Sequence, residues 1–462
     1  MANTPVAILD GTLTDIADAI RGKNGSSDTY KPGEMPAAIT AIPSGGGDVV
    51  NGIISRFKAT SDTVDANTFV EFVNTITPGT DTRLVATSDS YYNTSAVLVD
   101  ANTVFIAHRS GSYLYGIVCS ISGSTITPGT DTQLSTITNS YYDNSPVLID
   151  TNKIFIAHRG DSYHLNGLLC TISGTSITVD ADIELSSVYS SYQSASAVLL
   201  DTNKVFIAHR GADDYLCGMV CTISESTITA GTDTRLMSTK NAYKNTSAVL
   251  VDANKVFVSH ASTLSDYDHI YGVVCTISGT TITPGSNTQI VTGTYAAEDN
   301  ALALVETNKV FIIYRNGNYL YGVVCTISGT TITPGSDTQL TTTTSSFDDN
   351  SLALVEPNRF FIVHEISFRP YGIVCTISGT TITIGTDTLL TSANNTSDYA
   401  KVVRVDTDKV LVAHRGSSNY LYGMVCTAPE ITVKAATSQF TVGGITKSAC
   451  TSATEGDVWV LN

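Results

Sequence analysis

Short apolar stretches broken by turn residues recur along most of the chain. One repeating unit holds four of them, in the forms S-A-V-L-V-D, N-K-V-F-I-A-H-R, Y-G-I-V-C-T-I-S and T-I-T-P-G-T-D-T-Q-L. Apolar and β-branched runs of this length, bounded by Gly, Asp, Asn and Pro, predict β-strands. Each unit therefore predicts an antiparallel meander of four strands.

The unit occurs seven times at a nearly constant period. Its landmark residue, in the middle of the second strand, is Phe105, Phe155, Phe206, Phe257, Phe311, Phe361 and Leu411. Four-stranded units at a period of about fifty residues are typical of propeller blades. We predict an all-β fold, a seven-bladed β-propeller of four-stranded blades.

The position of the fourth-strand motif predicts how the ring closes. The first strand of the unit is almost wholly apolar, as expected of an inner strand buried on both faces. The fourth carries Pro128, Pro284 and Pro334, which favours an outer edge. A copy of this motif, Ile76–Leu84, precedes the first complete unit, and the last unit lacks one. We therefore expect Ile76–Leu84 to be the outer strand of the seventh blade, whereas an open superhelix would show atypical polar end units instead.

The remaining segments are short. Residues 1–44 place Leu13, Ile16, Ala17 and Ile20 on a helical period, which predicts a small helical N-terminal module. Residues 45–74, with glycines at 45–47, are expected to be a linker. The propeller is expected to span residues 75–427, and a β-type tail the residues 428–462.

Composition narrows the range of partners. With 25 Lys and Arg against 42 Asp and Glu, the net charge is −17, and a nucleic-acid partner is not expected. Only 15% of residues are charged, so hydroxyl and amide groups dominate the surface, which suits neutral polar ligands such as glycans. The start of the chain shows no secretion signal and no apolar run approaches membrane-spanning length, so we expect a soluble protein without membrane insertion.

Cysteine and aspartate patterns give no strong metal signal. Seven of the nine cysteines recur once per unit, which predicts buried apolar positions in separate blades, too far apart for disulfides. The repeated Asp-x-Asn, as at Asp100–Asn102, could supply calcium ligands but is also ordinary hairpin chemistry. No metal and no cofactor are predicted.

Successive turns of a meander alternate between the two faces of the ring, and the turns of this chain differ by face. The first-to-second and third-to-fourth turns are short and uniform, whereas the second-to-third turns vary and carry aromatic residues. Variable turns on a rigid scaffold commonly form binding surfaces. We predict ligand-binding residues at Tyr113, Tyr163, His164, Tyr215, Tyr267, His269, Tyr319, Arg369 and Tyr420. The tyrosines repeated in register, Tyr115, Tyr321, Tyr371 and Tyr422, could equally pack between the blades.

Catalytic patterns are weak, and no catalytic residues are predicted. His-Arg pairs such as His108-Arg109 recur in several units, which favours a structural role. The sialidase propeller pattern requires a repeated tryptophan, and Trp459 is the sole one. A polysaccharide depolymerase needs paired carboxylates, for which Asp213, Asp214, Asp266, Asp268 and Glu365 are candidates by location only. We predict a non-enzymatic protein.

The N-terminal segment I-L-D-G-T-L-T-D-I-A-D-A-I-R-G-K-N-G-S-S-D-T-Y-K-P-G-E-M-P-A-A-I-T-A-I (8–42) resembles a module of tail and baseplate proteins from phages and phage-like particles of Gram-positive bacteria. Residues 442–461 resemble the β-hairpin ending of similar proteins. The resemblance implies a virion protein, made in the host cytoplasm, that docks on other tail or baseplate proteins through residues 1–44 and forms a homo-oligomer in the particle. Its propeller is then expected to bind a host-surface glycopolymer or surface protein. A purely structural baseplate or fibre component is the alternative, and a depolymerase a lesser one.

Overall fold

The computed structural model describes the propeller in eleven segments. These are residues 76–86, 93–138, 144–161, 164–187, 195–211, 214–238, 242–262, 269–291, 297–342, 350–391 and 400–428, with the side chains of 242–244 and 297–299 left out, and a separate set of backbone strands within 54–73 and 432–460. The helical module predicted for residues 1–44 lies outside the described residues. Among the described elements no helix has the length and apolar character needed to cross a membrane.

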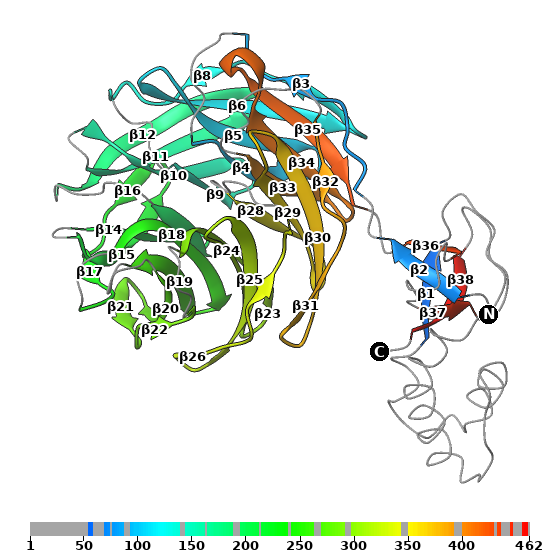
Figure 1. Ribbon diagram of the computed structural model, residues 1–462. Coiled ribbons are helices and arrows are strands. Elements are labelled where there is room, and N and C mark those ends of the chain that lie inside the picture. Colours follow the sequence, from blue (N-terminus) through cyan, green and yellow to red (C-terminus); the bar gives the residue numbers. More distant parts are fainter. Residues whose placement is uncertain are drawn as a thin grey trace. The chain divides into compact units, whose positions relative to one another are not determined.

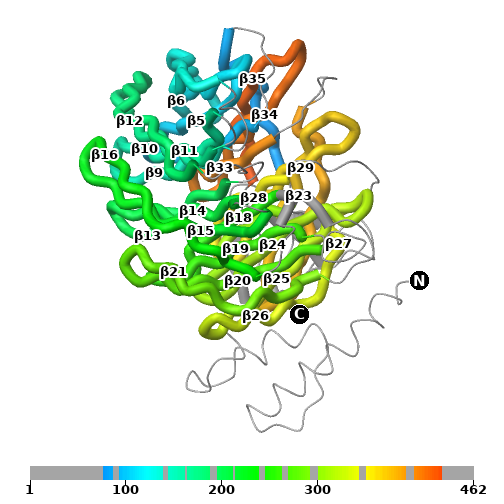
Figure 2. Tube along the Cα trace, turned by 90° about the vertical axis from the view of Figure 1, so that its left-hand side faces the viewer, coloured from blue at the N-terminus to red at the C-terminus, as the bar shows by residue number. Residues whose placement is uncertain are grey.

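Seven antiparallel sheets stand around a common axis, one for each repeat (Figure 1). The inner strands of successive blades lie side by side, and β33 of the last blade adjoins β4 of the first. Figure 2 shows β19 and β20 of the fourth blade beside β24 and β25 of the fifth, and residues of these two sheets share one hydrophobic cluster. The predicted all-β, seven-bladed propeller with four-stranded blades is confirmed.

Each blade runs from an inner to an outer strand. The inner strands are β4 (Ser95–Asp100), β9 (Ser145–Asp150), β13 (Ser196–Asp201), β18 (Ala242–Asp252), β23 (Ala297–Glu306), β28 (Ser351–Glu356) and β33 (Lys401–Asp406). The second strands are β5 (Thr103–Ser110), β10 (Lys153–Arg159), β14 (Lys204–Arg210), β19 (Lys255–Ser262), β24 (Lys309–Asn316), β29 (Arg359–Glu365) and β34 (Lys409–Arg415). The third strands are β6 (Tyr113–Ser122), β11 (Leu165–Ser173), β15 (Leu216–Ser224), β20 (His269–Ser278), β25 (Tyr319–Ser328), β30 (Pro370–Ser378) and β35 (Leu421–Thr427), the last preceded by the 3-10 turn η3 (Ser417–Asn419).

The fourth strand is interrupted in most blades, a detail that the sequence pattern did not predict. Blades 1 and 3 to 6 form it from two short pieces: β7 (Thr125–Pro128) with β8 (Thr132–Gln133), β16 (Thr227–Thr229) with β17 (Thr234–Arg235), β21 (Thr281–Pro284) with β22 (Thr288–Gln289), β26 (Thr331–Pro334) with β27 (Thr338–Gln339), and β31 (Thr381–Ile384) with β32 (Thr388–Leu389). In three of these blades a proline, which cannot donate to the ladder, is the last residue of the first piece. Blade 2 has Val-Asp-Ala instead of Pro-Gly-Thr, and its β12 (Ser176–Ser186) runs unbroken.

A glycine follows the first piece because the chain passes very close to the third strand. The N–H of Gly129 donates to the carbonyl oxygen of Val118 at 2.8 Å. A Cβ atom at this glycine would lie 2.8 Å from the same oxygen. The Pro-Gly pair therefore both breaks the outer strand and keeps it seated on the blade.

The hydrophobic core lies between adjacent blades. The landmark phenylalanines and Leu411 are fully buried, as are the seven repeated cysteines. Burial raises the pKa of Cys119 to about 12, so the thiol behaves as a small apolar side chain. The eight described cysteines, including Cys217, are free and buried.

The displaced fourth-strand motif closes the ring. Its strand β3 (Thr82–Arg83) pairs with β35 of the seventh blade, and Thr77 forms a bridge to Thr427. Leu84 is buried among residues of the seventh and first blades. Ile76 packs between the sixth and seventh blades. This is the pairing that the sequence predicted for Ile76–Leu84.

A second compact unit comprises residues 1–75 and 429–462. Its sheet has the order β1 (Ile54–Lys58), β38 (Glu455–Val460), β37 (Gly444–Thr446), β2 (Phe69–Val73) and β36 (Thr432–Ala435). The expected linker at residues 45–74 is therefore corrected, because it contributes two strands. Their pairing partners come from the far end of the chain, so the local sequence gave little indication of them.

Candidate functional site

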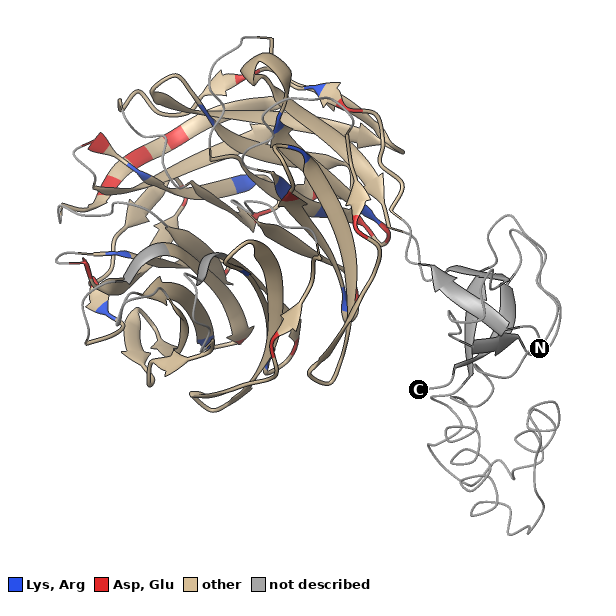
Figure 3. Cartoon of the chain, viewed as in Figure 1, with Lys and Arg blue, Asp and Glu red and all other residues tan. Residues whose placement is uncertain are grey.

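The strand directions assign every turn to one of two faces of the propeller. The variable face carries the starts of the inner strands, the second-to-third turns and the starts of the third strands. The uniform face carries the first-to-second and third-to-fourth turns. Charged residues are sparse and scattered over the blades, with an acidic group on β12 (Figure 3).

On the uniform face the turns are held by their own residues. Asp150, Asp201 and Asp252 each accept a hydrogen bond from the next backbone N–H, at 2.6–2.7 Å. Lys255 also pairs with Asp252 at 2.8 Å. The aspartates of the Asp-x-Asn repeat thus stabilise the turns between the first and second strands.

Buried histidines bind the outer segment in six of the seven blades. The Nε2–H donates to a side-chain oxygen of the Pro-Gly-Thr-Asp segment or its equivalent in the pairs His108–Asp131 (2.9 Å), His158–Asp182 (3.0 Å), His209–Asp233 (3.1 Å), His260–Asn287 (3.0 Å), His364–Asp387 (3.0 Å) and His414–Asp81 (3.0 Å). The last of these joins residues at opposite ends of the propeller. These contacts, the clamps, give the histidines the structural role predicted for the His-Arg pairs.

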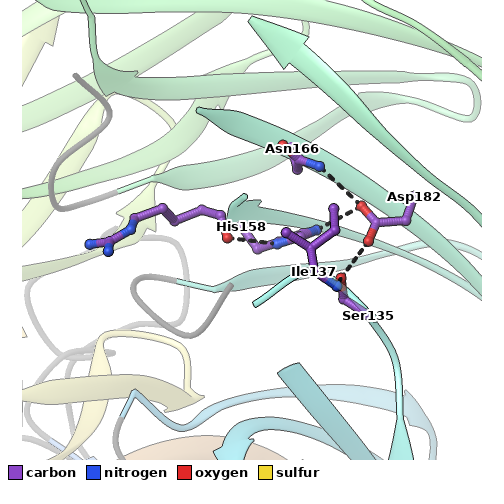
Figure 4. Close-up of polar contacts among 6 residues, drawn as sticks. Ser135, Ile137, His158, Asn166 and Asp182 are labelled. Carbon is purple, nitrogen blue, oxygen red and sulfur yellow. Dashed lines mark hydrogen bonds and ion pairs between the residues drawn. The ribbon is translucent and has the colours of Figure 1, made fainter. Parts of the chain in front are cut away.

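Blade 2 shows why a clamp is not a catalytic triad (Figure 4). Asp182 accepts hydrogen bonds from His158, from Asn166 at 3.3 Å and from Ser135 at 2.6 Å. Burial tends to raise the pKa of Asp182, but the hydrogen bonds, led by that from His158, hold it below its usual value. Because the Ser135 hydroxyl donates to Asp182 and not to His158, the three residues do not form the serine–histidine–aspartate relay of a triad.

The carboxylates considered for a depolymerase do not form a described pair. Asp214 is bound to Arg210, and Glu365 is buried. Asp213, Asp266 and Asp268 lie outside the described residues. No cluster of three or more metal-binding side chains occurs within the described part of the chain.

Seven of the nine predicted binding residues occupy equivalent positions. In each blade a residue near the end of the second strand pairs with a residue near the start of the third, as in Arg109↔Leu114, Arg210↔Leu216 and Arg415↔Leu421. The predicted binding residue directly precedes the third-strand member of this pair. These turn-end residues, one per blade, are Tyr113, His164, Tyr215, His269, Tyr319, Arg369 and Tyr420. All seven are partly exposed on the variable face. Tyr163 and Tyr267 lie outside the described residues.

Three turn-end residues contact the variable residue of the Asp-Thr-x-Leu motif. Arg235 lies over the ring of Tyr215 at 4.1 Å from its centroid, and Arg83 lies over Tyr420 at 4.7 Å. His164 Nδ1 lies 2.9 Å from a carboxylate oxygen of Glu184. Such cation–π and ion-pair contacts orient the side chains before any ligand arrives. The motif spacing was visible in the sequence, but these partners were not predicted.

Tyrosines two residues further along have a structural role. Tyr115, Tyr371 and Tyr422 stack on the clamp histidines of their blades with ring centroids 6.0 Å apart. Tyr321 stacks in the same way on Tyr314, which replaces histidine in blade 5. These tyrosines therefore have a packing role, as the alternative expected, but the stacking partner lies in the same blade and not in a neighbouring one.

Blade 6 presents an exposed aromatic residue that the prediction omitted. Ile366 and Arg369 exchange backbone hydrogen bonds of 2.9 and 3.2 Å, so Ser367 and Phe368 are the centre of a two-residue turn. Both have positive φ, 51° and 61°, where Asn-Gly is usual. Phe368 is 58% exposed. A bulky residue in this conformation stores strain of a kind that concentrates at functional sites.

The prediction also missed a polar pocket at the mouth of the central channel, on the variable face. Its lining comes from all seven blades: Asn93, Thr94, Ser95, Asn144, Ser145, Ala195, Ser196, Asn245, Thr246, Ser247, Asn300, Ala301, Asn350, Ser351 and Lys401. Its volume is about 230 Å³. The available signal was an Asn or Thr followed by Ser in four of the seven blades, and it becomes meaningful only when the ring brings the copies together.

No protein-family model matches the chain, and no curated protein matches its sequence. Solved structures with similar architecture include a periplasmic gluconolactonase of Pseudomonas aeruginosa (10% identity, 63% of this chain and 83% of that one, TM-score 0.49). A putative 6-phosphogluconolactonase of Bacteroides uniformis (9%, 72% and 99%, 0.48) and the six-bladed fucose-binding lectin of Aleuria aurantia (11%, 68% and 100%, 0.42) are also similar. Similarities of this size carry no argument about activity or ligand.

Proposed function

We propose that this chain is a non-enzymatic receptor-binding protein of a phage tail or baseplate, whose propeller binds a host-surface glycopolymer or surface protein. The resemblance of residues 8–42 to tail and baseplate modules supports the location in a particle. The division of the chain into two compact units is consistent with one unit that docks and one that binds.

The observation that carries the binding role is the contrast between the two faces. The uniform face repeats the same self-bonded turns, whereas the variable face places one turn-end residue on each blade, and six of these seven are tyrosine or histidine. Aromatic faces stack on the C–H faces of sugars, and neighbouring hydroxyls and amides address the sugar oxygens. Glycopolymer binding is thus the function that this face supports best.

The strained turn of blade 6 supports the same face. Phe368 gains little in the folded chain from a conformation that costs about 1–3 kcal/mol, and its ring remains largely in water. A contact with a ligand or partner supplies a reason for retaining it. Arg369, the adjacent turn-end residue, adds a planar guanidinium group that can donate several hydrogen bonds to a ligand.

The test is binding of the full chain to purified cell walls of the host. Tyr113→Ala should weaken binding by about 5- to 30-fold, corresponding to about 1–2 kcal/mol for an aromatic contact. Asn203→Ala, an exposed change on the uniform face, is the matched control and should leave binding unchanged. Equal losses from the two variants, at unchanged melting temperature, would refute the assignment of the binding face.

Two further readouts separate the alternatives. Incubation with host polysaccharide should release no new reducing ends, and release would identify a depolymerase. Deleting residues 1–44 should abolish incorporation into particles while cell-wall binding persists. A chain that enters particles but binds no host surface would instead be a structural component.

A further inference from the structure

The channel-mouth pocket is built around a ring of serines. The first lining position of the inner strand is Ser95, Ser145, Ser196, Ser247 and Ser351 in five blades and Lys401 in the seventh. A ring of hydroxyl groups from separate blades converges on one small space. The hydrogen bonds that the lining residues make, and those they leave unmade, show which ligand groups this space can bind.

Three of these serines have a hydroxyl proton left over. Ser145 Oγ accepts from the N–H of residue 197 at 2.9 Å, Ser196 Oγ from residue 248 at 3.0 Å and Ser351 Oγ from residue 402 at 3.2 Å. A serine hydroxyl that accepts a bond still carries one proton to donate. Within the described part of the protein these three serines have no acceptor for it, so the protons are available to a guest in the mouth.

The wall also contains oxygens without partners. Thr94 Oγ1 and Asn144 Oδ1 have no hydrogen bond although both residues are more than nine-tenths buried. The reason at Asn144 is visible by comparison with blade 4, where the Ser259 hydroxyl donates to the equivalent Asn300. Blade 1 has Ala107 at that place, so the amide oxygen lacks its donor. An unpaired buried polar group destabilises the fold, and a polar ligand that lets the wall rearrange around it would recover part of that loss.

The size and chemistry of the mouth indicate the guest. A volume of about 230 Å³ is more than ten times the roughly 10–15 Å³ that a single water molecule requires, which leaves room for one sugar ring. The described lining has spare donors and acceptors but no carboxylate, which disfavours calcium. A neutral polyhydroxyl compound offers both donors and acceptors in matching number.

We infer that the channel mouth binds a single neutral hexose-type sugar, the terminal unit of a glycopolymer whose remainder lies over the variable face. This inference rests on the proposed function for its biological role, but the pocket argument itself concerns only the mouth. The serine ring fixes the sugar hydroxyls, and the turn-end residues contact the units that follow.

The test is titration of the full chain with free glucose, galactose and N-acetylglucosamine, followed by calorimetry and saturation-transfer NMR. At least one should bind saturably, in the millimolar range. Ser196→Ala should weaken that binding at least fivefold, whereas Ser196→Thr, which retains the hydroxyl, should restore most of it. Ser224→Ala, an exposed change on the uniform face, should have no effect. Melting temperatures identify any loss that comes from unfolding.

Other outcomes separate the inference from the function on which it rests. If no hexose binds while Tyr113→Ala still weakens cell-wall binding, the mouth inference fails and the proposed function stands. If a hexose binds at the mouth but the chain does not bind cell walls, the mouth inference stands and the proposed function fails. Lys401→Ser restores the residue found in other blades and should change hexose binding less than Ser196→Ala. A larger loss in this variant, together with preferential binding of glucuronate or inorganic phosphate, would overturn the neutral class of ligand.

Discussion

Blade 4 should make the propeller sensitive to acid, and one substitution should remove that sensitivity. Its clamp joins His260 to Asn287, where five other blades use an aspartate. His260 is fully buried, and this burial lowers its pKa from 6.5 to about 4, against the opposing effect of the Asn287 hydrogen bond. The folded blade therefore holds a neutral imidazole across a pH range in which the unfolded chain protonates it.

The sign and size of the effect follow from proton linkage. Between pH 6.5 and about 4 the unfolded state binds more protons, so stability falls as the pH falls and is fully present above 6.5. A difference of about 2.5 pKa units corresponds to about 3 kcal/mol at pH 4 and about 2 kcal/mol at pH 5. With an unfolding entropy of about 2.1 cal/mol/K per residue, 2 kcal/mol lowers the melting temperature of this propeller by roughly 3 °C.

Asn287→Asp places a carboxylate 3.0 Å from the imidazole, as in the other blades, and should raise the pKa of His260. The loss between pH 7.5 and pH 5 should then be about 2 kcal/mol smaller in the variant than in the native protein, by denaturant titration or calorimetry. Acid effects elsewhere cancel in this difference. Asp131→Asn is the reciprocal control and should add an acid-dependent loss in blade 1. Identical losses in the native protein and Asn287→Asp would refute the reasoning.

Four further substitutions test other parts of the structure. Ala107→Ser should stabilise the protein by about 1 kcal/mol in denaturant titrations, since the new hydroxyl can donate to Asn144, whereas Ser259→Ala should destabilise it by about 1–3 kcal/mol; effects of the same sign would argue against the pairing. Leu84→Ala should cost about 2–5 kcal/mol, and a loss below 1 kcal/mol would show that the closing segment contributes little. Phe368→Gly should raise the melting temperature by relieving positive-φ strain and weaken cell-wall binding, and a lowered melting temperature would contradict the strain.

The repeat made the propeller predictable because each copy carried the same strand pattern. Seven copies fixed the number of blades, and the displaced Ile76–Leu84 motif fixed the closing pair. The split of the outer strand could not be predicted from the strand pattern alone, because it depends on a proline that interrupts the ladder and on the close contact of Gly129 with Val118. The strands at 54–58 and 69–73 were missed because their partners lie almost four hundred residues away along the chain.

The binding face was predictable in part. The turn-end residues could be predicted from their position in the turns, and the structure adds that each blade carries one of them at an equivalent place. The Arg235 and Arg83 contacts depend on a strand that pairs beside each turn, and the channel mouth depends on residues more than three hundred positions apart. Such long-range contacts leave only a faint local trace, here the Asn-Ser or Thr-Ser before the inner strands.

The seven blades also act as an internal comparison that separates scaffold from binding positions. Equivalent residues in different blades share one fold environment, so positions fixed by packing should agree, as the buried landmark residues and clamp histidines nearly do. Where the copies differ at exposed positions, packing has not dictated the choice. The turn-end residues and the variable residue of Asp-Thr-x-Leu differ in this way, and both lie on the variable face. Glu184 and Arg235 occupy the same register with opposite charge, a difference that backbone geometry does not explain and that a ligand with a different group above each blade would.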